Sequence, residues 1–219
     1  MRNTIVGIVL ATGLLFSGTS PSRADTVLDY SAGPAGTGSF GDPTNQNGSG
    51  IYGQTFTTPA DSVLDSFTFY LAQIGDAPTT FRFSLFAFDG TNVTGDALFT
   101  SALTSTSVPF VYTPFEFQTG GISLSTGAQY AALLIADASS TGIAGALSFT
   151  EDVYAGGAFL VGETTDPHGQ LIQIADAGFE TAFKASFSSA AVPEPGTFAL
   201  LGASLLPMAG AITHRRRKA

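Results

Sequence analysis

The chain of 219 residues contains no cysteine and no tryptophan. Without cysteine it forms no disulfide and carries no thiol chemistry, so its stability must come from an apolar core. The absence of tryptophan counts against a sugar-binding platform built on indole rings. Only two histidines are present, His168 and His214, and a catalytic triad or a zinc site therefore lacks partners.

Basic side chains are scarce in the middle of the chain. Of eight lysines and arginines, six lie near the two ends, and only Arg82 and Lys184 fall within residues 25–192. The same segment holds sixteen aspartates and glutamates, which leaves it a net charge near −14. A surface with this charge repels phosphate backbones, so we expect no nucleic-acid partner.

The N-terminus has the three-part pattern of a secretory signal peptide. Arg2 precedes the apolar run 5–16, and the polar stretch "SGTSPSRA" then ends on small residues. This pattern predicts a signal peptide over residues 1–24, cleaved between Ala24 and Asp25. A retained membrane anchor is disfavoured, because the run of ~12 residues is shorter than the ~20 needed to cross a bilayer.

A second apolar stretch lies close to the C-terminus. Residues 196–213 are 18 uncharged, mostly apolar residues, which as a helix would measure ~27 Å against the ~30 Å of a bilayer core. We therefore predict a transmembrane helix here. The basic block that follows should stay in the cytoplasm and leave the preceding chain outside; it consists of Arg215, Arg216, Arg217 and Lys218. A buried core helix is the alternative, but it would place these charges beside an apolar core.

The triplet Pro193, Glu194 and Pro195, the apolar run and the basic block together resemble the PEP-CTERM sorting signal of exosortase substrates. The resemblance implies that the triplet is the recognition motif for a membrane-embedded, cysteine-dependent processing enzyme of Gram-negative bacteria. It also implies export across the inner membrane, transient anchoring, and a final place at the cell surface or outside the cell. The prolines hold the motif extended, where a protease can bind it. A permanently anchored spacer remains the alternative.

Between the two ends, apolar and polar residues alternate with the period of β-strands. The clearest runs are "SFTFYL" (66–71), "FRFSLFAF" (81–88) and "FETAFKASF" (179–187). In the last of these, alternation places the phenylalanines on one face and Glu180 and Lys184 on the other. The run "YAALLIA" (130–136) is apolar throughout, which favours a buried central strand over a helix. We predict nine or ten strands in an all-β antiparallel sandwich of jelly-roll type with a phenylalanine-rich core.

This pattern divides the chain into five parts. A signal peptide (1–24) is followed by a Gly/Ser/Asn-rich segment (25–50), the sandwich domain (51–187), a linker (188–192) and the sorting signal (193–219). Within the second part we predict an edge strand at residues 27–30 and a loop after it. We call the chain between the two terminal signals the body. From about residue 52 it also resembles, more loosely, the jelly-roll ectodomains of PEP-CTERM proteins, which implies a sandwich but no catalytic residues.

Few residues are candidates for chemistry. His168, in "TTDPHGQ", has the surroundings of a turn residue. Glu151 and Asp152 form the densest acidic spot, but sequence neighbours on a strand point to opposite faces and seldom form a glycosidase pair. Oxygen ligands for a calcium ion would come from Asp42, Asn45 and Asn47 together with Glu151 or Asp152. The loop "DPTNQNGSG" lacks the closing glutamate of an EF-hand, however, and a solvated turn is the alternative.

Tyrosines are the remaining candidates for sugar binding. Four of them would stack on sugar rings if exposed, although half-burial in a sheet is commoner; they are Tyr30, Tyr52, Tyr112 and Tyr154. The sequence thus favours a non-catalytic exported surface or matrix protein associated with biofilm or extracellular polysaccharide. A carbohydrate-binding module is the alternative, and a glycan hydrolase is less favoured than either.

Overall fold

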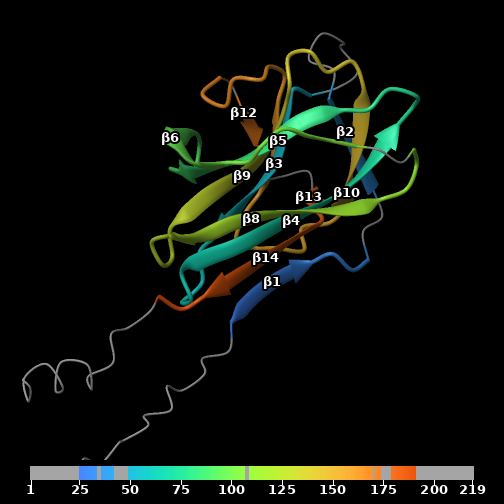
Figure 1. The fold of residues 1–219 in the computed structure, drawn as a ribbon. Coiled ribbons are helices and arrows are strands. Elements are labelled where there is room, and N and C mark those ends of the chain that lie inside the picture. The colour runs from blue at the N-terminus through green and yellow to red at the C-terminus, as the bar shows by residue number, and fades with distance from the viewer. Residues whose placement is uncertain are drawn as a thin grey trace, which may run out of the picture. The chain divides into compact units, whose positions relative to one another are not determined.

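A computed structural model describes residues 25–33, 36–41, 49–106, 109–169, 171–173 and 179–190 of the chain (Figure 1). The predicted signal peptide, sorting motif, apolar run and basic block lie outside these residues, as do the calcium candidates Asp42, Asn45 and Asn47. The described part consists of strands without a helix, arranged as two antiparallel sheets. No helix among these residues is long and apolar enough to cross a membrane.

The first sheet is built around the long strand β4 (Val63–Ile74). One side of β4 pairs with β8 (Thr113–Ser123). The other side pairs with β14 (Phe183–Ser188) over its first half and with β10 (Ile143–Phe149) over its second half. The remaining strands of this sheet extend it beyond β14 and β10; they are β1 (Thr26–Tyr30), β2 (Gly36–Gly41) and β13 (Glu180–Thr181).

The second sheet has β9 (Gln129–Ala136) near its centre, between β3 (Ile51–Thr57) and β5 (Thr80–Phe88). Seven of the eight residues of β9 are buried, which confirms the prediction of a central strand for "YAALLIA". The outer strands of this sheet are β12 (Leu171–Gln173), β11 (Phe159–Gly162), β6 (Val93–Thr100) and β7 (Thr104–Ser105).

The all-β prediction is confirmed, and the facing residues of the two sheets form an aromatic core. Its centre is Phe67, fully buried, with ring centroids 5.0–5.6 Å from those of Phe56, Phe69, Phe83 and Phe183. A smaller apolar cluster covers the opposite face of the second sheet and includes Phe86, Phe88, Leu133 and Ile135. Strand β9 is therefore buried on both faces, which explains why "YAALLIA" lacks alternation.

The loop predicted after the first edge strand is wrong over residues 36–41, which form β2 on the flank of β10. The segment "GTGSFG" pairs here because its glycines allow a close approach and Phe40 enters the core. A Cβ on Gly38 would lie 2.4 Å from the ring of Tyr52, so a side chain has no room at this position. The edge strand itself is confirmed, since β1 pairs only with β14 among the described strands.

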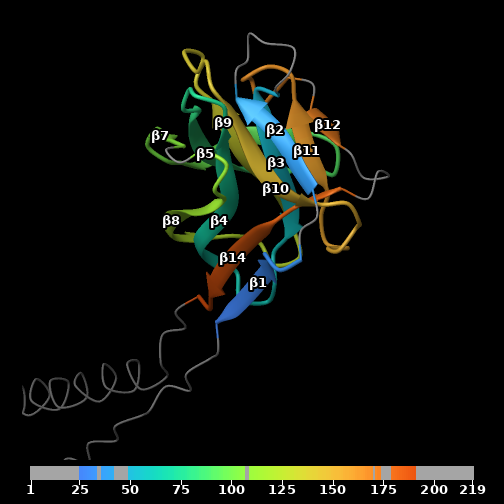
Figure 2. The same cartoon turned by 90° about the vertical axis from the view of Figure 1, so that its right-hand side faces the viewer.

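Both ends of the described body leave from one end of the sandwich. Thr26 of β1 stands opposite Phe187 of β14, and the two strands lie side by side in Figures 1 and 2. We call this the proximal end. The opposite, distal end carries the loops 75–79, 137–142 and 163–169, here called the distal rim, toward the top of Figure 2. The twelve residues of β4 connect the two ends, a length of ~40 Å in an extended strand.

Candidate functional site

The residues predicted to carry chemistry are scattered over the body. His168 lies exposed in a turn, where its backbone N–H donates to the Asp166 carboxylate at 3.0 Å and its ring meets the edge of Phe86 at 5.7 Å. Glu151 and Asp152 are both exposed in the connection after β10. His168 therefore anchors its loop against the second sheet, and no contact brings it to the acidic pair.

The four candidate tyrosines do not form a common surface. Tyr52 is 1% exposed and Tyr154 is also buried, while Tyr30 is half-buried and packs on Tyr154 and Phe183. Tyr112 is 37% exposed, and its hydroxyl is hydrogen-bonded to Thr37. Three of the four rings are thus used in or beside the core, as is common for sheet tyrosines.

Two buried tyrosines differ in how their hydroxyls are satisfied. The Tyr154 hydroxyl accepts a hydrogen bond from the N–H of Thr57 at 3.0 Å. The Tyr52 hydroxyl has no hydrogen-bond partner among the described residues. Burial raises the pKa of Tyr52, and the neighbouring Thr181 and Ser148 side chains offset only part of this rise. A buried hydroxyl without a partner is destabilising, whereas a bonded one is not.

We therefore expect opposite effects from the same substitution at these positions. Tyr52→Phe removes an unsatisfied hydroxyl and should raise the free energy of unfolding by about 1 kcal/mol, whereas Tyr154→Phe should lower it by about 1 kcal/mol. Urea denaturation of both variants measures this difference. A destabilised Tyr52→Phe variant would show that the hydroxyl has a partner in solution.

The strongest departure from the predicted pattern is Glu180, which is only 3% exposed although alternation places it on the solvent face. The prediction is wrong because both residues of β13, Glu180 and Thr181, are buried where this short strand pairs with β10 and lies against β3 of the opposite sheet. Gln54 of the opposite sheet donates its side-chain N–H to the Glu180 carboxyl and accepts the backbone N–H of Thr181 at 3.0 Å. These bonds join the two sheets.

Burial raises the pKa of the Glu180 carboxyl to about 8, the bond from Gln54 lowers it in part, and the charge of Asp152 raises it further. The group is therefore mostly protonated at neutral pH. Its location between the sheets leaves it almost no surface for a ligand, so we assign it a structural role. Sequence patterning offered no signal for it, because the pairing of β13 is set by tertiary structure.

A groove on the outer face of the second sheet, unlike the site of Glu180, has charged and polar side chains that a ligand can reach. It encloses about 360 Å³ over β5 and β9 and reaches the distal rim. Its polar lining comes from Arg82, Ser84, Thr100, Asp137 and Thr165, and its apolar lining from Ile135, Ala136, Ala138 and Pro167. We call it the Arg82 groove. It contains Arg82, the one arginine within residues 25–192. The sequence shows that basic residues are rare in this segment, but it does not show where Arg82 lies in the fold.

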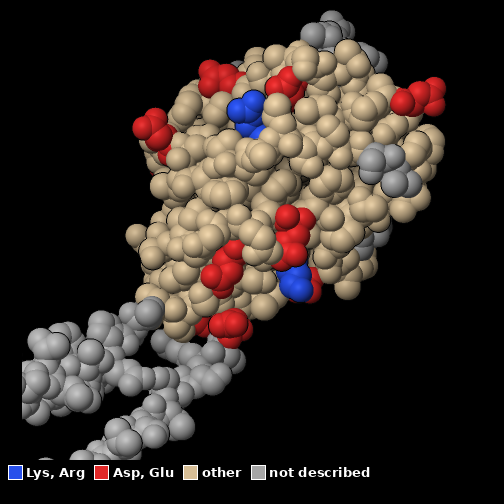
Figure 3. Space-filling view, viewed as in Figure 1, with Lys and Arg blue, Asp and Glu red and all other residues tan. Residues whose placement is uncertain are grey.

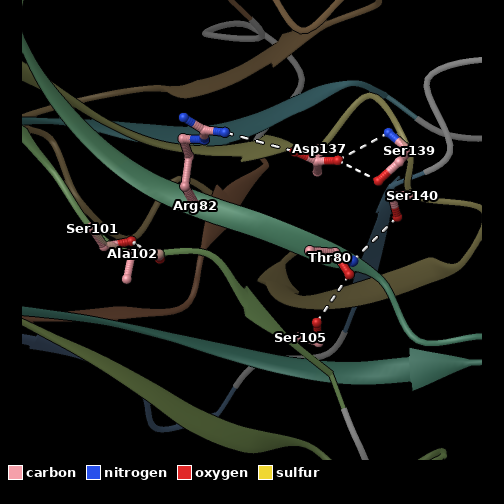
Figure 4. A network of polar contacts seen from close by, with 8 residues as sticks. All are labelled: Thr80, Arg82, Ser101, Ala102, Ser105, Asp137, Ser139 and Ser140. Atoms are coloured by element: carbon pink, nitrogen blue, oxygen red, sulfur yellow. Dashed lines mark hydrogen bonds and ion pairs between the residues drawn. The ribbon is translucent and has the colours of Figure 1, made fainter.

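Two opposite charges face each other in the Arg82 groove. An Nη2 atom of Arg82 lies 3.7 Å from Oδ2 of Asp137, and the Arg82 side chain remains 42% exposed (Figure 4). The other carboxylate oxygen of Asp137 accepts bonds from the N–H and the hydroxyl of Ser139, at 3.0 and 2.5 Å. These bonds and the nearby guanidinium lower the pKa of Asp137, so its carboxylate is ionised at neutral pH.

A second hollow of about 530 Å³ opens between the edges of the two sheets, β6 and β7 on one side and β8 on the other. Core rings reach its wall, among them Phe99, Phe115 and Phe117. Beyond the start of β8, Phe110 is 73% exposed with a backbone φ of 58°, unusual for a residue other than glycine. The lining of this hollow also includes the polar residues Ser101, Thr104, Glu116 and Gln118.

Comparison with protein-family models found no match for this chain, and comparison with curated proteins found none either.

Proposed function

We propose that this chain is an exported, non-catalytic protein of the cell surface or extracellular matrix, delivered by a C-terminal PEP-CTERM signal. An exosortase-type enzyme would be its processing partner, the bilayer its transient anchor and extracellular polysaccharide its surroundings. The signal-peptide pattern at residues 1–24 and the order of motif, apolar run and basic block at 193–218 support this proposal. We further propose that the sandwich is of the jelly-roll type.

The observation that carries the proposal is the position of the two body ends. Because β1 and β14 are neighbours, the chain enters and leaves the sandwich at the proximal end. Only residues 189–192 separate the end of β14 from Pro193. A processing enzyme can therefore act on the motif without unfolding the body, and the distal rim is the part of the body farthest from the attachment point.

The surface suits a hydrated matrix. The face shown in Figure 3 consists mostly of uncharged residues, with acidic groups scattered over it and basic groups confined to small patches. Strands β6 and β8 expose mostly polar, glycine and acidic residues along the sheet edges, together with Leu98 of β6. A net negative charge spread in this way keeps a protein soluble and discourages self-association.

Processing can be tested by intact mass spectrometry of the protein from the membrane and medium fractions of its native host. We expect wild-type protein whose mass ends near residues 193–195. Replacing Pro193, Glu194 and Pro195 by alanine should leave Arg215–Ala219 attached and keep the protein in the membrane fraction. Pro207→Ala, which changes a proline of the tail outside the motif, is the matched control and should be processed normally.

A wild-type mass that retains Arg215–Ala219 in both fractions would contradict the proposal. The apolar run would then be a permanent anchor, and the body would belong to the periplasmic face of the membrane. Equal processing of the alanine variant and the wild type would show that the triplet is not the recognition motif.

A carbohydrate-binding role is the second candidate, and one observation favours it. The Arg82 groove brings a guanidinium, a carboxylate and three hydroxyls together over an apolar floor. Binding pockets for small molecules usually combine a mainly apolar lining with a few oriented polar groups.

A further inference from the structure

We propose that the Arg82 groove binds a neutral oligosaccharide of two or three sugar units, and that Arg82 and Asp137 together hold adjacent hydroxyl groups of one sugar. This inference deepens the proposed function, since it assigns a ligand class and a site to a protein of the polysaccharide matrix.

Arg82 and Asp137 lie close to each other in the groove, but their charged groups are not directly hydrogen-bonded. At 3.7 Å the Arg82 and Asp137 side chains attract each other without forming a hydrogen bond of normal length. A guanidinium has five N–H donors, so most of those of Arg82 are available to a ligand at its 42% exposed side chain. Asp137 likewise offers Oδ2, while Ser139 occupies its Oδ1.

This arrangement selects for uncharged ligands. Arginine only donates hydrogen bonds and an ionised aspartate only accepts them. A sugar hydroxyl can both donate and accept, so it would accept a hydrogen bond from Arg82 and donate one to Asp137. The hydroxyl on the adjacent ring carbon would bond to the same two side chains in the same way. A carboxylate or sulfate ligand would be repelled by Asp137 and by the acidic body, and a cation would be repelled by Arg82.

The size and lining of the groove match the same class. A volume of about 360 Å³ falls in the ~300–1,000 Å³ range of small-molecule sites. Thr100 and Thr165 are among its polar lining residues, and the Thr100 hydroxyl is held by a hydrogen bond of 3.1 Å to that of Ser84. The apolar atoms of Ile135, Ala138 and Pro167 supply a surface for the C–H face of a sugar ring.

The loops that form the groove are held in place without a ligand. In the loop 137–142, the Ser140 hydroxyl accepts the N–H of Thr80 at 3.2 Å, and the Asp137 N–H donates to the Thr80 carbonyl at 2.8 Å (Figure 4). The loop carrying Thr165 and Pro167 is anchored by the His168 ring on Phe86. A site whose walls are already ordered loses little entropy when it binds.

The test uses the full chain in detergent and an array of neutral glucose, galactose and mannose trisaccharides, with oligogalacturonates of the same length for comparison. We expect binding to at least one neutral trisaccharide, followed by calorimetry with that sugar. Arg82→Ala should weaken binding at least ~10-fold, and Thr165→Val, a change of similar shape, by ~3-fold or more. The matched control is Lys184→Gln, which removes the other cation of the body, on β14 of the opposite sheet, and should bind as the wild type does.

Asp137→Asn separates the proposed ligand class from an acidic one. The asparagine keeps an oxygen for Ser139 but loses the charge, so it should bind the neutral trisaccharide more weakly and the oligogalacturonate more strongly than the wild type. Tighter binding of oligogalacturonate by the wild type would overturn the ligand class. Three results would overturn the site. They are no binding by the wild type of any probe at ~1 mM, a loss of affinity in Lys184→Gln as large as that in Arg82→Ala, and unchanged affinity in both Arg82→Ala and Thr165→Val.

Failure here is distinguishable from failure of the proposed function. The masses of the exported protein report on sorting alone, and the array reports on binding alone. A correctly processed protein without sugar binding would overturn only this inference, and an unprocessed protein that binds would overturn only the sorting proposal.

Discussion

Phe67→Ala is expected to lower the free energy of unfolding by about 3–5 kcal/mol, the range found when a buried phenylalanine is truncated. Phe67 is fully buried, and its ring contacts those of Phe56, Phe69, Phe83 and Phe183. Alanine would remove one ring from the middle of this group and leave a cavity between the sheets. Domains are stable by only about 5–15 kcal/mol, so the variant should unfold at a much lower urea concentration.

Phe110→Ala is the matched control for this prediction. The same atoms are removed, but from a side chain that is 73% exposed, so the expected change is below about 0.5 kcal/mol. The positive φ of this residue adds no cost to the substitution, because alanine is no more strained in this backbone conformation than phenylalanine. Equal destabilisation by the two variants would mean that the aromatic cluster is not the centre of the core.

Glu180→Gln is expected to stabilise the protein at pH 8 and to have little effect near pH 4.5. The folded state keeps Glu180 protonated up to a pKa of about 8, whereas the unfolded chain ionises near the ordinary value of 4.5. Between these values the folded state binds more protons, so the wild type loses stability as pH rises through this window. The slope is at most ~1.4 kcal/mol per pH unit, and residual solvent screening reduces it.

Glutamine at this position is neutral at every pH and has nearly the same shape, so it can still accept the bond from Gln54. Urea denaturation from pH 4.5 to 8.5 measures the free energy of unfolding of wild type and variant. The difference between the two reports on residue 180, because both proteins contain the same other carboxylates and their contributions largely cancel. Glu116→Gln on the exposed face of β8 is the control and should change little across this range. A wild type and variant with parallel pH profiles would show that Glu180 is ionised in the folded state.

Much of the fold was predictable from local pattern. Alternation in "SFTFYL" and in residues 183–187 predicts strands with the correct buried faces, because one side of each strand packs on the core. The run 130–136 predicts a central strand because it is apolar on both faces, and the structure places it there. The strand at 36–41 is not predictable in this way, because its glycines are typical of a loop and only the fold shows that the Tyr52 ring leaves no room for a side chain at Gly38.

The candidate site was not predictable in the same way. Arg82 stands out in the sequence as one of two cations in an acidic body, but its partner Asp137 lies on another segment, 55 positions along the chain. The tyrosines suggested as sugar platforms are mostly core residues, because facing strands turn them inward. Burial and pairing across the sheets decide such roles, and a single sequence does not contain the pairing.

The sequence by itself determined the strand-forming pattern of the body and its acidic charge, since these depend on composition and on order along the chain. The export and sorting signals at its ends remain predictions from the same kind of pattern. Tertiary structure alone decided that Glu180 is enclosed beside Gln54 and that Arg82 meets Asp137 at the distal rim. The physical reason is that burial and electrostatic environment depend on which distant segments become neighbours when the two sheets close on each other.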